Sequence, residues 1–275
     1  MSTLSYFTRD GLSLAYRTAG EGFPIVFVHG FTGNMRNWAL TAPVVARSYR
    51  AISVDLRGHG ESQASDRPEA YTPDVLAEDV YHLLQLLGVD ACVLVGHSMG
   101  GRVAQEFALA HGELLRGLVL VDTSAGGRAR SVQNVSLEEV EAMIREGGME
   151  AVFDRVVSRG FLATPETRAN PEAREAWRRQ FLKTSPYAYL YCSRAMAESR
   201  VLLDLLPQIR VPALVICGER DEPFVQPSRE LHERLPDSRL VYIPGAGHSP
   251  QIERPEAFNA ALLDFLAAVV PGGAP

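Results

Sequence analysis

The chain has 275 residues, of which 46% are hydrophobic and 22% charged, as in an ordinary globular protein. Its formal net charge of −6 argues against a general affinity for nucleic acid or for an anionic membrane. No apolar run approaches the ~20 residues of a membrane span, and the first residues lack a signal-peptide layout. Three cysteines without zinc-site spacing predict a reduced, cytoplasmic protein that needs no structural metal.

The first predicted elements are a hairpin and a series of buried strands. Residues 4–16 alternate weakly around Asp10-Gly11, which predicts an antiparallel hairpin at a sheet edge. Short apolar runs rich in β-branched residues then recur, and such runs predict strands that are buried on both faces. The runs are 25–28, 51–54, 91–95, 118–121, 214–216 and 240–243.

Amphipathic stretches separate these strands. Apolar residues between 76 and 87 recur at helical spacing, and Gly88 follows them as a C-cap. The same spacing runs from 258 to 269 and stops before Pro271. Strands joined by single helices pair in parallel through right-handed crossovers. We therefore expect an α/β fold, with a mostly parallel, doubly wound sheet and helices on both of its faces.

The alternation stops after Asp122 and resumes at Val211. Residues 124–206 contain several amphipathic segments but no buried-strand run. An insertion of this length between two core strands predicts either a lid over the site or a dimerisation element, and we favour the lid. The expected domains are a core formed by 1–123 and 207–275, and a helical cap formed by 124–206.

The strongest local signal is the segment from Gly96 to Gly101, which reads Gly-His-Ser-Met-Gly-Gly. It follows a predicted strand and opens a helix, so Ser98 should occupy a tight turn that holds its hydroxyl clear of the backbone. Gly96 and Gly100 are expected because a Cβ there would meet the neighbouring strand or helix. The helix N-terminus also favours negative charge. The segment predicts that Ser98 is a nucleophile.

A serine nucleophile needs a general base, and the base needs an orienting acid. Among the seven histidines, His29 and His59 lie in turn-rich loops and are expected to bond to nearby backbone. His97 should point away from the tight turn. His248 differs, because it lies in a loop between the last predicted strand and the last helix. It is the predicted base.

Two aspartates follow predicted strands and could orient His248. Asp221 follows the strand at 214–216, whereas Asp122 follows the strand before the insertion, where it could cap a turn or the first inserted helix. The order Ser98, Asp221, His248 matches the nucleophile–acid–base order of hydrolases built around such a turn. We therefore predict Asp221 as the acid.

With these motifs in place, the sequence resembles the α/β-hydrolase fold superfamily over essentially its whole length. It looks most like the small bacterial esterases and lactonases with a helical cap. The resemblance implies an eight-stranded, mostly parallel sheet and assigns Ser98 as nucleophile, His248 as base and Asp221 as acid. It also implies an oxyanion hole formed by the backbone amides of Phe31 and Met99. The motifs that carry it are His29-Gly30-Phe31, the segment from Asp55 to Ser62, the segment from Gly96 to Gly101, and the Asp221/His248 pair.

The implied activity is the hydrolysis of a small carboxylic ester or lactone through an acyl-enzyme, without cofactor or metal, by a monomer or homodimer. Ser98 sets aside the relatives that use an aspartate nucleophile. The alternatives are an enol-lactonase, a C–C bond hydrolase of aromatic degradation, a cofactor-free haloperoxidase-like side activity, a menaquinone-pathway synthase and a non-catalytic ligand receptor. The synthase is disfavoured because its usual Leu-Pro-Gly is Leu56-Arg57-Gly58 here.

The substrate is less constrained by the sequence. Most aromatic residues of the insertion are expected to form its own small core, and the remainder would line an apolar pocket. Arginines of the insertion could also clamp a substrate carboxylate, with Arg128, Arg155 and Arg194 as candidates. The aromatic residues are Phe153, Phe161, Trp177, Phe181, Tyr187, Tyr189 and Tyr191.

Overall fold

The computed structural model describes residues 3–126, 136–158 and 169–270. Its centre is an eight-stranded sheet in the order β1-β2-β4-β3-β5-β6-β7-β8. The β1–β2 hairpin is antiparallel and joins β4 in antiparallel fashion, while all other neighbours are parallel. The predicted edge hairpin and mostly parallel sheet are confirmed. The strands are β1 (Thr3–Arg9), β2 (Leu12–Ala19), β3 (Pro24–Val28), β4 (Arg50–Val54), β5 (Cys92–His97), β6 (Leu115–Val121), β7 (Ala213–Gly218) and β8 (Ser238–Ile243).

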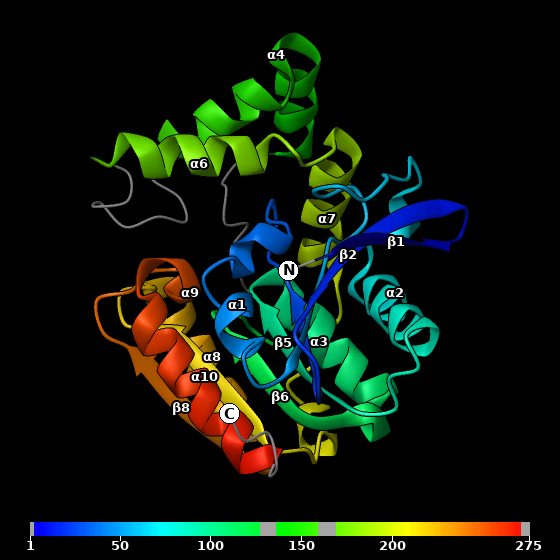
Figure 1. The fold of residues 1–275 in the computed structure, drawn as a ribbon. Coiled ribbons are helices and arrows are strands. Elements are labelled where there is room, and N and C mark those ends of the chain that lie inside the picture. The colour runs from blue at the N-terminus through cyan, green and yellow to red at the C-terminus, as the bar shows by residue number, and fades with distance from the viewer. Residues whose placement is uncertain (1–2, 127–135, 159–168, 271–275) are drawn as a thin grey trace.

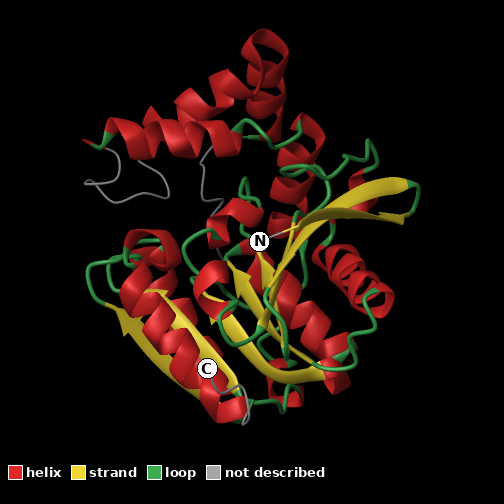
Figure 2. Cartoon of the chain, viewed as in Figure 1, coloured by secondary structure: helices red, strands yellow, loops and turns green. Residues whose placement is uncertain are grey.

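Helices cover both faces of this sheet (Figure 2). One face packs on α2, α3 and α8, and the other on α1 and α10. Alternate residues of a strand enter opposite cores: Val26 faces the first set of helices, and Phe27 faces the second. Both faces are apolar, which explains the unbroken apolar runs in the sequence. The core helices are α1 (Ala42–Val45), α2 (Pro73–Leu86), α3 (Met99–Ala110), α8 (Glu222–Arg234), α9 (Pro250–Glu253) and α10 (Pro255–Val269).

The strand order places a crevice at the carboxyl ends of the central strands. β3 lies between β4 and β5, so the chain passes from β3 to β4 on one side of β3 and then crosses to β5 on its other side. Where such connections diverge, parallel sheets leave a crevice that binds ligands. The loop after β3 and the turn after β5 both open into this crevice. These are the segments that contain Phe31 and Ser98.

The described part of the insertion contains α4 (Leu137–Ser158), α6 (Pro171–Phe181), α7 (Pro186–Glu198) and the short 3-10 helix η4 (Leu206–Gln208), and no strand. Helices α4 and α6 lie together at the top of the view, apart from the sheet, and α7 leads back toward it (Figure 1). The aromatic residues Phe153, Phe181 and Tyr189 are buried in a cluster of their own, against which Trp177 and Phe31 pack. Phe161 lies outside the described residues.

The cluster supports the expectation that most of these aromatic residues form a separate small core. The boundaries 1–123, 124–206 and 207–275 stay a prediction. Within the residues that the structure describes, no helix is both long and apolar enough to cross a membrane.

Candidate active site

Ser98 lies between β5 and α3 in a conformation that few residues adopt. Its φ of 51° and ψ of −116° fall outside the ordinary allowed regions. A Cβ on Gly96 would lie 2.3 Å from the Gly100 carbonyl oxygen, and a Cβ on Gly100 would lie 2.5 Å from two carbonyl oxygens of the β3 end. The glycines expected from the sequence are therefore required for this close approach.

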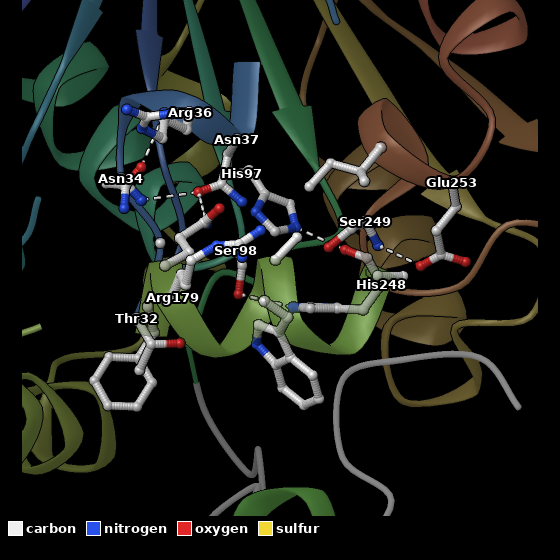
Figure 3. Close-up of a pocket in the computed structure, with 18 of the residues that line it drawn as sticks. Thr32, Asn34, Arg36, Asn37, His97, Ser98, Arg179, His248, Ser249 and Glu253 are labelled. Atoms are coloured by element: carbon white, nitrogen blue, oxygen red, sulfur yellow. Dashed lines mark hydrogen bonds between the residues drawn. The ribbon is translucent and has the colours of Figure 1, made fainter. Parts of the chain in front are cut away.

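The end of β6 braces the Ser98 turn. The Ser98 N–H donates to the Val121 carbonyl at 2.8 Å, and the Thr123 hydroxyl donates to the Ser98 carbonyl at 2.7 Å. A turn held on both sides of one residue keeps its strained backbone in place, because neither peptide can rotate without losing a hydrogen bond. The Ser98 side chain is left facing the crevice (Figure 3).

A hydrogen-bonded chain connects three of the predicted residues. His248 Nδ1 lies 2.7 Å from Asp221 Oδ2, and His248 Nε2 lies 3.0 Å from Ser98 Oγ. With Nδ1–H donating to the carboxylate, Nε2 keeps its lone pair for the serine hydroxyl. The Phe224 ring lies 4.7 Å from the imidazole ring and covers part of it. The order and spacing match a nucleophile, a base and an orienting acid.

Asp122 also enters this cluster, although it does not bond to His248. A carboxylate oxygen of Asp122, a carboxylate oxygen of Asp221 and a ring nitrogen of His248 all lie within 4.8 Å of one another. The 2.7 Å contact between His248 and Asp221 is a hydrogen bond, and a cation would have to break it to bind both groups. Asp122 instead accepts the Gly218 N–H at 2.8 Å, across to β7. Among the described residues, its carboxylate accepts no N–H group of an inserted helix.

Two residues for which the sequence indicated no such role hold the loop of His248. His97 points away from the tight turn, as expected, and its Nε2–H donates to the His248 carbonyl at 2.6 Å. Burial lowers the pKa of His97 to about 3, so this ring is neutral. The Glu253 carboxylate accepts the N–H groups of Gly247 and Ser249 at 2.9 and 3.2 Å. The backbone is therefore fixed on both sides of His248.

The predicted oxyanion-hole donors lie on the two loops beside Ser98. Among the described residues, neither the Phe31 N–H nor the Met99 N–H has a hydrogen-bond acceptor. A Cβ on Gly30 would lie 2.8 Å from His97 Nδ1 and 3.1 Å from Ser98 Cβ, so the loop after β3 can approach the serine only as glycine. Two free amides at such a position are suited to hold a developing negative charge.

Buried polar residues fix the loop that contains Phe31. His29 donates to the Gly30 carbonyl at 2.8 Å and accepts the Leu56 N–H at 3.0 Å, so it structures the loop as predicted. Asp55 accepts the N–H groups of Met35 and Glu61 at 2.6 and 2.8 Å, and burial raises its pKa to about 6. His59 bonds to the Arg57 carbonyl, and burial lowers its pKa to about 4.

A cavity of about 540 Å³ opens beside Ser98 and His248, between the sheet and α6 (Figure 3). Trp177 and Gln180 of α6 line one wall, and Gln180 donates to the Asn37 side chain at 2.6 Å. Leu40 and Ile252 add exposed apolar surface on the core side. The cavity size is in the range of small-molecule sites.

The cations that line this cavity differ from those expected. Arg36, Arg179 and Lys183 line it, and Lys183 pairs with Glu61 outside the cavity. Of the arginines named from the sequence, Arg194 forms an exposed pair with Glu198, and Arg128 lies outside the described residues. Arg155 does not line the cavity. Helical periodicity could not reveal which arginines face a space formed by two parts of the chain.

Comparison with known proteins places this geometry in a family. The model of the alpha/beta hydrolase family matches residues 25–261. A thermophilic esterase from Thermogutta terrifontis is 32% identical, with a TM-score of 0.85, over 98% of this chain and 99% of that one. The enol-lactonase from Burkholderia xenovorans LB400 is 29% identical, with a TM-score of 0.85, over 96% of this chain and 100% of that one.

A curated relative from Bacillus subtilis (strain 168) is 29% identical over 98% of this chain and 100% of its own length. It carries the name of a 2-succinyl-6-hydroxy-2,4-cyclohexadiene-1-carboxylate synthase. The chain is thus similar in sequence and fold to proteins with more than one named activity. It belongs to the alpha/beta hydrolase family.

Proposed function

We propose that this protein is a serine hydrolase that cleaves small carboxylic esters, lactones included, through an acyl-enzyme on Ser98. The observation that carries the proposal is the continuous hydrogen-bonded chain from Asp221 through His248 to Ser98, at 2.7 and 3.0 Å. The likeness to an esterase and an enol-lactonase over nearly the whole chain supports it. The cavity beside Ser98 provides room for a small ester.

The reaction begins when Ser98 Oγ attacks the acyl carbon while His248 Nε2 takes the hydroxyl proton. Asp221 stabilises the imidazolium that forms, and the amides of Phe31 and Met99 hold the oxyanion. The tetrahedral intermediate then expels the alcohol, which receives the proton from His248. In the second half, His248 takes a proton from water, which attacks the acyl group. The second tetrahedral intermediate expels Ser98 Oγ, which takes the proton back from His248, and the acid is released.

The test is steady-state turnover of a short-chain nitrophenyl ester, followed by labelling with a serine-directed phosphonate. We expect sustained turnover and one label on Ser98. Ser98→Ala should abolish both, with losses on the order of 10⁶ in kcat, because the attacking oxygen is gone. Ser249→Ala is the matched control, since Ser249 also lines the cavity but is outside the hydrogen-bonded chain.

Labelling of another residue, with activity retained in Ser98→Ala, would refute the nucleophile. A single burst without further turnover would instead favour the ligand receptor among the alternatives. A product formed by elimination, with no water consumed, would favour the synthase. These outcomes separate the alternatives because they depend on what happens after attack on the substrate.

One observation favours a second, narrower candidate: an ester or lactone that carries a carboxylate. Arg36, Arg179 and Lys183 line the cavity of a chain whose net charge is negative. Arg179 pairs with Glu175 and Lys183 with Glu61, whereas among the described residues the Arg36 guanidinium has no ion-pair partner. Cations gathered in one cavity raise the local concentration of an anionic substrate and slow its departure.

This candidate predicts a higher kcat/KM for a carboxylate-bearing nitrophenyl ester than for a neutral ester of equal length. The preference should fall with added salt, because exposed charges are screened. Arg36→Gln should reduce it, whereas Arg174→Gln, on α6 but outside the cavity lining, should not. An unchanged preference in Arg36→Gln would remove this candidate and leave the general esterase proposal standing.

A further inference from the structure

Asp122 is a buried carboxyl that the proposed reaction does not use. It directly follows β6, with a left-handed φ of 43°, and its side chain is fully buried. Its own N–H donates to the Ile216 carbonyl of β7 at 2.9 Å. Such a backbone is unfavourable for most residues but is tolerated by aspartate and asparagine. The left-handed backbone of Asp122 therefore costs conformational free energy, which the hydrogen bonds of its side chain should offset.

One carboxylate oxygen of Asp122 organises the segment that contains Asp221. Its Oδ1 accepts the Gly218 N–H at 2.8 Å, and the Asp221 N–H closes a turn onto the Gly218 carbonyl at 3.0 Å. The next residue after Asp122, Thr123, donates its hydroxyl to the Ser98 carbonyl. The end of β6 thus contacts both the acid side and the nucleophile side of the proposed triad.

The other oxygen of Asp122 creates an electrostatic problem. Oδ2 is buried and accepts no N–H or O–H group of a described residue, while Asp221 lies in the same cluster. Among the described residues, no arginine or lysine forms an ion pair with Asp122. Two adjacent carboxylates in a dry site repel each other, and burying an unpaired charge is costly.

The titratable groups around Asp122 come from four elements. They are Asp221 at the start of α8, His248 in the loop after β8, Cys217 in β7 and His97 at the end of β5. Burial first, and then the charge of Asp221, raise the pKa of Asp122 well above its usual value, against the opposing effects of the Gly218 N–H and the Cys217 side chain. None of these neighbours supplies a fixed positive charge.

We propose that Asp122 is a positioning residue that stays protonated in the working enzyme. Its Oδ1 holds the Gly218 N–H, and its Oδ2–H is directed toward the Asp221 carboxylate, so the cluster presents one negative charge to His248. The proposal rests on the role proposed for Asp221. It explains how two aspartates can lie beside one histidine while only one of them bonds to it.

A direct test is infrared difference spectroscopy of wild type against Asp122→Asn, with isotope-labelled aspartate to identify the band. At pH 8 the Asp55 carboxyl, whose pKa is about 6, is ionised, so it does not interfere. We expect a carboxylic-acid C=O band in wild type that is missing from Asp122→Asn. The absence of this band in wild type overturns the proposal, whether or not the protein is an esterase.

A second test uses the acid limb of the pH profile of kcat/KM. Asparagine keeps an acceptor for Gly218 and a donor for Asp221 without adding charge, so Asp122→Asn should retain activity within about threefold and leave the limb in place. If Asp122 were ionised in wild type, its replacement would remove a negative charge near His248. The limb would then move to lower pH by about one unit or more, which contradicts the proposal.

The matched variant is Asp122→Gly, because glycine accepts the left-handed backbone while removing both oxygens. We expect kcat to fall about tenfold or more with little change in KM, since Gly218 N–H is left unpaired and Asp221 is less well held. If asparagine at position 122 keeps kcat and glycine does not, the side chain positions its neighbours. A residue that only has to tolerate the left-handed backbone would be replaced equally well by either. Equal activity of the two variants would overturn the positioning role.

The two proposals can fail separately. If wild type turns over no ester, the same pH dependence is measured on phosphonate labelling of Ser98. If the phosphonate does not label Ser98 either, the proposed function fails, and the infrared band still decides whether Asp122 is protonated.

Discussion

The two sides of the cavity are held in different ways. On the sheet side, Ser98, His248 and Asp221 are connected to one another, and backbone hydrogen bonds fix the segments on either side of them. On the side of the insertion, α6 reaches the core through the Gln180–Asn37 hydrogen bond and the exposed Lys183–Glu61 pair. Exposed pairs contribute little to stability, typically ~0–1 kcal/mol.

From this difference we expect the sheet side to carry out the reaction and the side of the insertion to select the substrate. Catalytic groups must keep their geometry to within a fraction of an ångström. The carboxyl ends of the strands, with their many hydrogen bonds, can hold them that closely. The wall formed by Trp177 and its neighbours only has to shape a space. We therefore expect changes on the sheet side to alter the reaction rate, and changes on α6 to alter which ester is preferred.

After the loss of the nucleophile itself, the largest effect should come from breaking the hydrogen-bonded chain on the sheet side at Asp221. Asp221→Asn keeps the shape but favours the wrong histidine tautomer, so kcat should fall by ~10⁴, as for the corresponding change in serine proteases. Steady-state kinetics and circular dichroism together provide the measurement. A folded Asp221→Asn protein with nearly full activity would show that another group orients His248.

The sheet side should also make stability depend on pH. His59 and His97 have pKa values lowered by burial to about 4 and about 3, so the unfolded chain binds more protons below pH 6.5. Between pH 7 and 5, each should remove about 2 kcal/mol from the free energy of unfolding. Asp55, with its pKa raised to about 6, acts in the opposite direction by about 1 kcal/mol. Asp122, protonated as proposed, acts in the same direction as Asp55, and His29, whose pKa burial lowers well below its usual value, acts with the other two histidines.

Urea unfolding at pH 7 and at pH 5 measures this balance. We expect lower stability at pH 5, and a smaller difference in His59→Gln, which has no group to protonate there. An equal change in wild type and His59→Gln would mean that His59 is not held neutral in the folded protein.

The loop of His248 offers a smaller effect on the same side. Glu253→Ala removes the acceptor for the Gly247 and Ser249 N–H groups, so kcat should fall about tenfold while KM changes little. Glu222→Ala, at the exposed start of α8, is the control. A change confined to KM would indicate that Glu253 contacts the substrate instead.

The smallest effect on rate, and the one that most sharpens the comparison, is expected on α6. Trp177→Ala enlarges the cavity and should change the ratio of kcat/KM between long and short acyl esters by a fewfold to about tenfold. Tyr189→Phe is the control, because Tyr189 is buried in the separate aromatic cluster and does not line the cavity. Unchanged ratios in Trp177→Ala would favour dimerisation over substrate selection for the insertion.

The sequence by itself was sufficient for the elements whose signals are local. Buried parallel strands must be apolar on both faces, so their runs were visible, and β5 differs from its predicted range 91–95 by beginning at Cys92 and extending to His97. The tight turn at Ser98 was visible because close backbone approach demands glycines at fixed spacing. The match to the hydrolase family follows from those same local constraints.

Contacts between distant segments were decided only by the tertiary structure. Asp221 and Asp122 both follow strands, and their different partners, His248 and Gly218, depend on how the loops after β7 and β8 fold over the sheet. No periodic pattern in the sequence indicates that His97 and Glu253 bond to the His248 loop. No such pattern indicates that Arg36 and Arg179 line the cavity. These are single contacts between segments far apart in the chain, and only packing brings those segments together.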